Sequence, residues 1–143
     1  MQQVKIKNVL LVDDSKPTNF LHKKVISTTN EVQNIYTVYD GTEALDFLQK
    51  KGQFKEITEY PDIIFLDINM PKMNGFEFLE HYEKHNREQP IGALIVILTT
   101  SNWDSDKKKA MENSLVYDFL EKPLSKSKVL EVINAFEAKK VVL

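Results

Sequence analysis

The stretch DIIFLDINMPKMNG, residues 62–75, contains an apolar run that ends in a carboxylate. The residues from Ile63 to Leu66 are all apolar, which is typical of a strand covered on both faces in a parallel sheet. Asp67 follows directly, and Asn74-Gly75 then favours a turn. A buried strand does not need a carboxylate at its tip, so Asp67 indicates a functional site.

This run belongs to a series in which short apolar stretches alternate with longer amphipathic ones. The five short stretches span residues 9–12, 35–39, 63–66, 93–98 and 116–120. They are typical of strands, while the stretches between them carry apolar residues at helical spacing. Five strand-then-helix units in series predict an α/β fold of the flavodoxin-like (βα)5 type. This fold is a doubly wound, five-stranded parallel sheet in three α/β/α layers.

The first and last expected helices have distinct patterns. Ser15 is a good N-cap for the first helix, with Pro17 in its first turn. One side of this helix, its expected packing face, carries Phe20, Leu21, Val25 and Thr28. The last helix has an apolar stripe at i, i+3, i+4 and i+7, formed by Val129, Val132, Ile133 and Phe136. A long charged connection, residues 50–60, precedes the third strand.

Composition narrows the class of protein. The chain has 143 residues, a net charge of −2 and no cysteine. The charge gives no attraction to nucleic acid or to anionic membranes, and the lack of cysteine excludes disulfides and thiolate metal sites. No apolar run approaches the ~20 residues that span a bilayer, and the N-terminus lacks the features of a signal peptide. We expect a cytoplasmic protein with a single domain over residues 1–143 and no effector domain.

Polar side chains follow four of the expected strands. These are Asp13-Asp14, Asp67, Thr99 and Lys122. The carboxyl ends of parallel strands meet at one edge of a sheet, where ligands bind. Carboxylates in one pocket repel one another unless a cation joins them, and oxygen ligands without His or Cys favour Mg²⁺ or Mn²⁺. A lysine and a hydroxyl beside them suit a phosphoryl group, and an aspartate can act as its nucleophile.

Four fragments carry a family resemblance: LLVDDS, IIFLDINMPKMNG, VILTTS and FLEKPL. In this order and spacing they resemble the receiver domain of two-component response regulators, over essentially the whole chain. The resemblance implies that Asp67 accepts a phosphoryl group from a phosphohistidine on a sensor histidine kinase or a histidine phosphotransfer protein. It also implies that the chain catalyses only its own phosphorylation and dephosphorylation. Output would pass through an unknown downstream target protein.

The resemblance assigns the metal ligands by position. It implies that Asp14 binds Mg²⁺ directly and that Asp13 binds it through water. Asp67 would complete the carboxylate set, and Asn69 would contribute its backbone carbonyl.

The resemblance also assigns the parts that respond to phosphorylation. Thr99 would be the switch hydroxyl, and Lys122 would contact the phosphoryl group. Phe119 would be the aromatic residue that changes rotamer. The Lys122-Pro123 peptide would be cis.

Other interpretations of these residues stay open. Asp13 and Asp14 can cap a helix, Thr99 can end a strand, and Phe119 can belong to the core. The chain can also act as a phosphorelay intermediate or a phosphate sink, or as a receiver-like interaction module that takes no phosphate. An aspartate-dependent phosphohydrolase of the haloacid-dehalogenase type is a further alternative. Such enzymes often carry a second aspartate two residues on, where this chain has Asn69.

Several residues outside this set have two interpretations. His81 and His85 lie four apart, as zinc ligands can, but without an evident third ligand they are expected to be surface residues. The lysines at positions 107–109 form either a solvated helix face or part of a docking surface. Trp103 is either a core residue or an anchor for a partner. The apolar end, residues 141–143, frays or docks.

Overall fold

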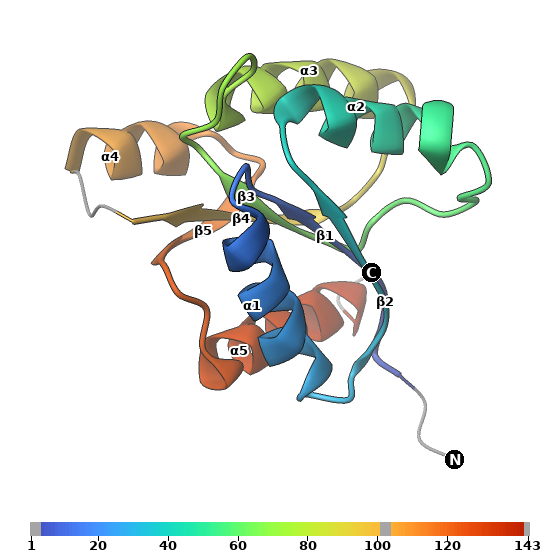
Figure 1. The fold of residues 1–143 in the computed structure, drawn as a ribbon, viewed down its shortest axis with the longest axis vertical. Coiled ribbons are helices and arrows are strands. Elements are labelled where there is room, and N and C mark those ends of the chain that lie inside the picture. Colours follow the sequence, from blue (N-terminus) through green and yellow to red (C-terminus); the bar gives the residue numbers. More distant parts are fainter. Residues whose placement is uncertain (1–3, 101–103, 142–143) are drawn as a thin grey trace.

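The computed structural model describes residues 4–100 and 104–141. Strands and helices alternate along the chain, with one short 3₁₀ helix, η1, before the third strand (Figure 1). The elements are β1 (Ile6–Val12), α1 (Lys16–Ser27), β2 (Val32–Val38), α2 (Gly41–Gln49), η1 (Gly52–Phe54), β3 (Ile63–Asp67), α3 (Gly75–Glu88), β4 (Leu94–Thr99), α4 (Asp104–Glu112), β5 (Val116–Glu121) and α5 (Lys126–Val141). The five predicted strand-helix units are confirmed, with ends shifted by a few residues. The predictions for Trp103 and for residues 142–143 fall outside the described residues.

All the strands pair in parallel in one sheet of order β2-β1-β3-β4-β5. Helices α2, α3 and α4 cover one face of the sheet, and α1 and α5 cover the other (Figure 1). The predicted doubly wound, three-layer fold is therefore confirmed. The chain winds outward in both directions from β1, so the carboxyl ends of β1 and β3 border the crevice where such folds bind ligands.

Alternate residues of each inner strand enter two separate cores. In β1, Leu10 and Val12 pack toward α2 and α3, whereas Val9 and Leu11 pack toward α1 and α5. Burial on both faces explains why the inner strands are continuous apolar runs. The predicted stripe of α5 is buried in the second core and comprises Val129, Val132, Ile133 and Phe136.

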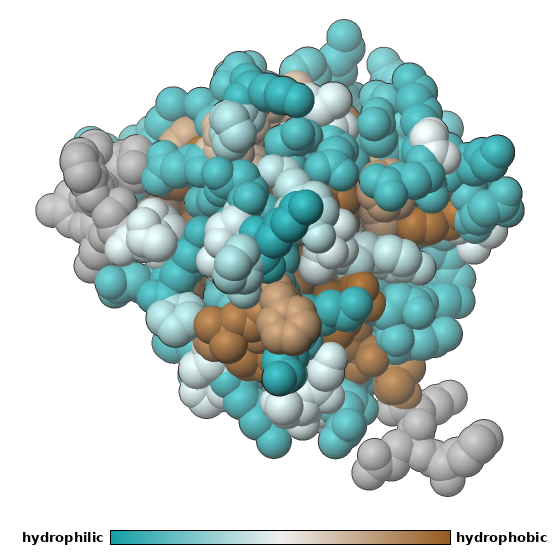
Figure 2. Space-filling view, viewed as in Figure 1, coloured by the Kyte–Doolittle hydropathy of each residue, from teal (hydrophilic) through white to brown (hydrophobic). Residues whose placement is uncertain are grey.

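The predicted packing face of α1 is wrong. Phe20 is 65% exposed and Leu21 is 47% exposed, Thr28 is also exposed, and Val25 is only partly buried. Apolar side chains accordingly gather on the surface over α1, bordered by hydrophilic ones (Figure 2). The buried residues of α1 are Asn19, His22 and Ile26. The inner face of α1 thus carries two polar side chains, whose partners are backbone groups of the neighbouring loops.

The charged connection over residues 50–60 is partly ordered by a buried aromatic residue. It contains η1, and the Phe54 ring lies edge-on to Phe47 of α2 with 5.2 Å between the ring centroids. Phe54 is 8% exposed, so this segment closes the end of the first core. In the described ranges, no helix combines the length and apolar character needed to cross a lipid bilayer.

Candidate functional site

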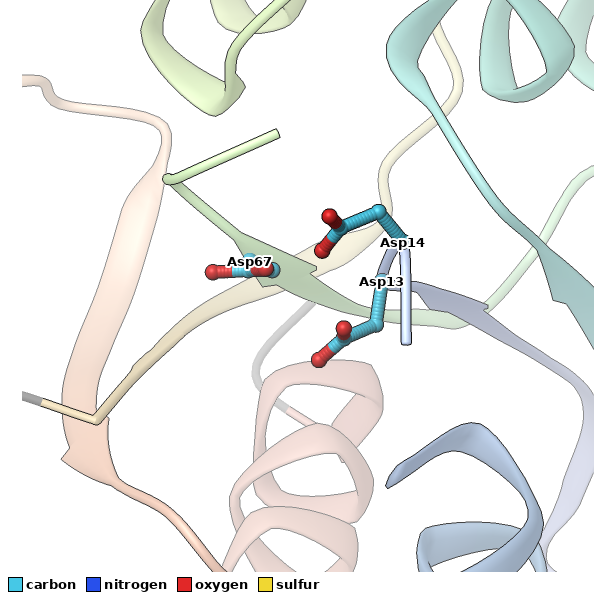
Figure 3. Close-up of side chains that lie close together, drawn as sticks. All are labelled: Asp13, Asp14 and Asp67. Atoms are coloured by element: carbon cyan, nitrogen blue, oxygen red, sulfur yellow. The ribbon is translucent and has the colours of Figure 1, made fainter. Parts of the chain in front are cut away.

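Three carboxylates meet at the carboxyl edge of the sheet. Asp13 and Asp14 follow β1, and Asp67 is the last residue of β3. Their side chains converge in the crevice between the two strands (Figure 3). One oxygen from each lies within 4.8 Å of the other two. The structure therefore brings together the acidic residues that the strand ends predicted would meet.

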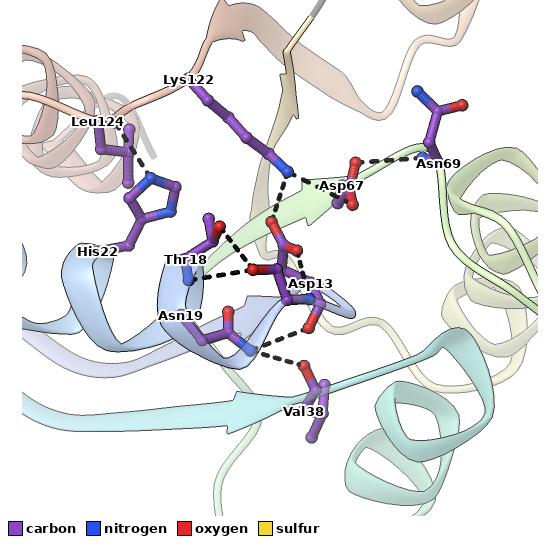
Figure 4. A network of polar contacts seen from close by, with 10 residues as sticks. Asp13, Thr18, Asn19, His22, Val38, Asp67, Asn69, Lys122 and Leu124 are labelled. Carbon is purple, nitrogen blue, oxygen red and sulfur yellow. Dashed lines mark hydrogen bonds and ion pairs between the residues drawn. The ribbon is translucent and has the colours of Figure 1, made fainter.

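Lys122 is the cation that joins this group. Its Nζ lies 2.6 Å from Asp13 Oδ2 and 3.4 Å from Asp67 Oδ2 (Figure 4). Its backbone N–H donates to the carbonyl of Thr99 at 2.7 Å, which fixes the start of the β5–α5 loop against the end of β4. The Lys122-Pro123 peptide is cis, as predicted.

Asp67 lies in an environment that disfavours its charge. Its side chain is nearly inaccessible to solvent, and this burial raises the pKa of Asp67 to about 6. The ammonium of Lys122 and the Asn69 N–H, which donates to Asp67 Oδ1 at 3.1 Å, oppose the rise in pKa, whereas Asp13 adds to it. Asp67 is therefore ionised at neutral pH but poorly solvated, which suits a carboxylate that is to form a bond.

A glycine lets α3 approach the backbone of Asp67. A Cβ on Gly75 would lie 2.8 Å from Asp67 O and 2.8 Å from Ile68 Cα, so only glycine fits without a backbone shift. The Gly75 N–H donates to Ile68 O at 3.1 Å. Asn74 caps the helix in a reciprocal capping box with Glu77. The turn residues after β3 thus hold the tip of β3 against α3.

The tip of β1 is held by side chains of α1. Asp13 Oδ1 accepts from the Ser15 N–H at 2.9 Å, and Ser15 is the N-cap of α1. The helix-cap interpretation of Asp13 and Asp14 is therefore wrong. Asn19 Nδ2 donates to the carbonyls of Asp13 at 3.0 Å and Val38 at 3.1 Å, joining the ends of β1 and β2.

The donor set fits a hard divalent cation. The three carboxylates supply oxygen ligands, and Asn69, two residues beyond Asp67, lines the same hollow as Asp14. Asp13 Oδ2 is buried, and its charge is paired with the Lys122 ammonium. Asp14 is exposed and reaches the crevice from its solvent side. Such an oxygen-only set favours Mg²⁺ or Mn²⁺ over zinc.

Thr99 and Phe119 lie on neighbouring strands beside this crevice. Thr99 ends β4, is fully buried, and pairs in register with Glu121 of β5. Phe119 is 8% exposed and belongs to the first core, with its backbone opposite Ile97.

The two histidines are not part of the acidic cluster, whereas Lys109 lines a surface hollow together with Asp14 and Asn69. His81 is exposed, and the His85 ring lies edge-on to Tyr60 at 5.8 Å; no metal-ligand cluster among the described side chains includes either histidine. The lysines at 107–109 are exposed on α4, and Lys109 Nζ lies 4.3 Å over the Phe76 ring. His85 is only partly exposed and its Nδ1 is buried, and the exposure of the three lysines agrees with both of their interpretations.

One buried residue near the site was not recognised from the sequence. His22 of α1 is 1% exposed, and its Nε2 accepts from the Leu124 N–H at 3.2 Å. Leu124 lies two residues after Lys122. The sequence signal is the spacing of Asn19, His22 and Ile26, which places these residues on one face of the helix.

Comparison with known proteins gives one consistent family. The family model of the response regulator receiver domain matches residues 9–134. The response regulator Rcp1 of Synechocystis is 35% identical over 100 residues, which cover 70% of this chain and 66% of that protein. The chain thus spans just under two thirds of Rcp1. Two-component response regulator 24 of Arabidopsis thaliana is 34% identical over 87% of this chain and 80% of its own length.

Solved structures have the same fold. A two-component response regulator from Cytophaga hutchinsonii has a TM-score of 0.84 and 28% identity, with 96% of this chain and 99% of that chain covered. The Mn²⁺-bound form of Rcp1 has a TM-score of 0.68 and 30% identity, with 92% of each chain covered. The metal in that structure is one of the two that the donor set here favours.

Proposed function

The chain belongs to the response regulator receiver family of two-component signalling, and on this premise we propose that Asp67 is its phosphoacceptor. The observation that carries the proposal is the meeting of three carboxylates and one buried lysine at the carboxyl edge of the sheet. Receiver domains are phosphorylated by histidine kinases or phosphotransfer proteins. We propose that such a protein is the donor here and that the cytoplasm is where the transfer takes place.

The transfer is an in-line displacement at phosphorus. An Asp67 carboxylate oxygen forms the new P–O bond while the P–N bond to the histidine of the donor breaks. The electron pair of the broken bond stays on the imidazole nitrogen, which takes up a proton from solvent. Burial of Asp67 removes the water that would otherwise stabilise its charge before the bond forms.

The neighbours of Asp67 stabilise the transferred group. The Lys122 ammonium, 3.4 Å from Asp67 Oδ2, is placed to hold one phosphoryl oxygen, and the Thr99 hydroxyl is proposed to hold a second. Receiver domains bind Mg²⁺ or Mn²⁺ at an acidic site, and Asp13, Asp14, Asp67 and the Asn69 carbonyl would hold it here. When bound, the ion neutralises charge on the phosphoryl oxygens.

The proposed output is a change of the surface formed by α4, β5 and α5. Phosphorylation adds about 1.5–2 negative charges at the tip of β3. Thr99 and Lys122 are drawn toward this charge, and their backbones are hydrogen-bonded to each other. Phe119 then repacks, and a downstream target protein binds the altered surface. A hollow on this surface is lined by Phe119, Leu124 and Lys128.

The phosphodonor protein is proposed to dock on α1. The exposed Phe20 and Leu21 form an apolar surface on a helix whose N-cap, Ser15, hydrogen-bonds to Asp13. Lys16 and Lys24 border it, and Lys24 Nζ lies 5.3 Å over the Phe20 ring. This surface suits a partner with an apolar contact and an acidic rim.

The alternatives differ in the fate of the phosphoryl group. A relay would pass the phosphoryl group on to another protein, and a sink would release it as phosphate, in both cases without a target protein. The single-domain organisation over residues 1–143 remains a prediction. Response regulators of the type of Rcp1 and the Arabidopsis protein are not enzymes. A haloacid-dehalogenase-like phosphohydrolase is the less favoured proposal, because Asn69 cannot serve as its general acid.

The test is phosphorylation of the intact chain by a small acyl phosphate with Mg²⁺, followed by mass spectrometry. The wild-type chain should gain one phosphoryl group, and Asp67→Asn should gain none. Asp62→Asn is the matched control at the opposite end of β3, where the carboxylate accepts from the Lys7 N–H at 2.8 Å. Phosphorylation of Asp67→Asn at the wild-type rate would refute the assignment.

A further inference from the structure

We propose that His22 is a positioning residue that sets the place of Lys122 through the β5–α5 loop. This inference rests on the proposed function of Lys122 as the phosphoryl-binding cation. It assigns a role to a side chain that touches neither the acidic cluster nor the phosphoryl group.

The first argument is the contact itself. His22 lies on the inner face of α1 and is 1% exposed, and Leu124 is 4% exposed. The Leu124 N–H donates to His22 Nε2 at 3.2 Å, a hydrogen bond between residues 102 positions apart (Figure 4). Without His22 this N–H would be buried in an apolar core with no acceptor from α1. The imidazole therefore fixes the loop backbone two residues beyond Lys122.

The second argument is the protonation state of the ring. Accepting at Nε2 requires a lone pair there, so the ring is neutral and carries its hydrogen on Nδ1. Burial lowers the pKa of His22, the charge of Lys122 lowers it further, and Asp13 opposes both. The acceptor is therefore present at neutral pH, as a fixed anchor requires.

The third argument is the neighbour of His22 on α1. Asn19, one turn earlier, donates to the carbonyls of Asp13 and Val38. The inner face of α1 therefore holds the backbone of Asp13 through one side chain and the loop of Lys122 through another. Asp13 and Lys122 are themselves joined at 2.6 Å, so the spacing of Asn19 and His22 on α1 helps to determine this ion pair.

The variants that test the role differ in the acceptor alone. His22→Leu replaces the imidazole with an apolar side chain of similar length and so removes the acceptor, whereas His22→Gln places an amide oxygen near the position of Nε2. Tyr82→Phe is the control for lost stability, because the Tyr82 hydroxyl also accepts from a buried N–H, that of Ala93 at 3.3 Å, near the amino edge of the sheet.

The first readout separates positioning from metal binding. His22→Leu should lower the rate of phosphorylation by a small acyl phosphate about tenfold or more, because small displacements of a catalytic group are costly. Its Mg²⁺ affinity should not fall, since the carboxylates remain in place and a displaced Lys122 competes less for Asp13. His22→Gln should recover most of the rate, and Tyr82→Phe should lose none.

The second readout does not need phosphorylation. The NMR resonance of the Lys122 ε-methylene, observed with ¹³C-lysine labelling, should shift in His22→Leu, return in His22→Gln and stay unchanged in Tyr82→Phe. A wild-type chain that takes no phosphate would refute the proposed function, and this resonance would still decide the role of His22. Wild-type resonance and rate in a folded His22→Leu variant would overturn the inference.

Discussion

The Lys122 ammonium lies 2.6 Å from the Asp13 carboxylate, and both side chains are largely buried. A divalent ion that binds Asp13 must therefore compete with Lys122 for this carboxylate. We expect Lys122→Met to bind Mg²⁺ about tenfold more tightly, since one positive charge close to the metal is removed. The same variant should lose most of its phosphorylation rate. Calorimetry measures the affinity.

The control for this charge effect is Lys139→Met. Lys139 is exposed, and its Nζ contacts Gly92 O before β4, at the opposite edge of the sheet. Lys139→Met changes the net charge by the same amount as Lys122→Met. Because the lost charge lies at the opposite edge of the sheet, the Mg²⁺ affinity should be unchanged. An equal gain in both variants would mean that the Lys122–Asp13 pair does not limit metal binding.

The raised pKa of Asp67 predicts a pH-dependent stability. Burial raises the pKa of Asp67 from 3.8 to about 6 in the folded chain, so between these values the folded state holds a proton that the unfolded state has released. Stability contributed by this proton is present at low pH and is lost as pH rises toward 6. Without Mg²⁺, Asp67→Asn should therefore be more stable than the wild type by about 2–3 kcal/mol above pH ~7, and by little below pH ~4.

Urea unfolding with a chelator present, repeated across this pH range, measures the difference. His22 is present in both the wild type and Asp67→Asn, so its titration cancels in the difference between their free energies of unfolding. Asp40→Asn is the control, because asparagine also serves as an N-cap for α2. A similar gain in Asp40→Asn would attribute the effect to overall negative charge and not to the burial of Asp67.

The contact of Gly75 with the Asp67 backbone predicts a selective cost of alanine. Gly75→Ala places a methyl group 2.8 Å from backbone atoms of Asp67 and Ile68, which cannot move without shifting the tip of β3. We expect a loss of about 1–3 kcal/mol and slower phosphorylation. In Gly41→Ala the added methyl meets the flexible Met73 side chain, also at 2.8 Å, so the cost should be smaller. Equal stability losses in denaturant melts, with equal phosphorylation rates, would contradict this account.

The acidic cluster could be predicted from the sequence because topology alone determines it. A (βα)5 chain places β1 beside β3, so residues at their carboxyl ends, such as Asp13 and Asp67, must meet. Lys122 follows β5, which is two strands from β3, and only the length of its side chain brings it to Asp67. Its position was predicted from the family resemblance and the strand ends together.

The inner face of α1 could not be predicted by apolar periodicity. That method assumes that buried positions are apolar, whereas Asn19 and His22 are buried because backbone groups of two loops need their polar atoms. The partner of His22 is 102 residues away, and no local pattern reveals it. Because the sequence analysis assigned the wrong face of α1 to the core, it also missed the exposure of Phe20 and Leu21.

The exposed surface of α1 predicts a separation between protein and small-molecule donors. Phe20→Ser and Leu21→Ser should slow phosphorylation by a phosphorylated histidine phosphotransfer protein that is active on the wild type. Phosphorylation by a small acyl phosphate should be unchanged, because that donor needs no docking surface. Stability should change by only about 0.5 kcal/mol, since both side chains are solvent-exposed.

Tyr117→Ser is the matched control for this surface. Tyr117 lies on β5 and is 46% exposed, against 47% for Leu21. The substitution therefore removes a comparably exposed side chain from the proposed output surface. Transfer from the phosphotransfer protein should be normal in this variant, while binding of a downstream target should weaken. If Tyr117→Ser slows transfer and Phe20→Ser does not, the donor docks beside β5, and the assignment of α1 is wrong. Stopped-flow measurement of the transfer rate against donor concentration decides between the two, because a docking defect raises the half-saturating concentration and spares the limiting rate.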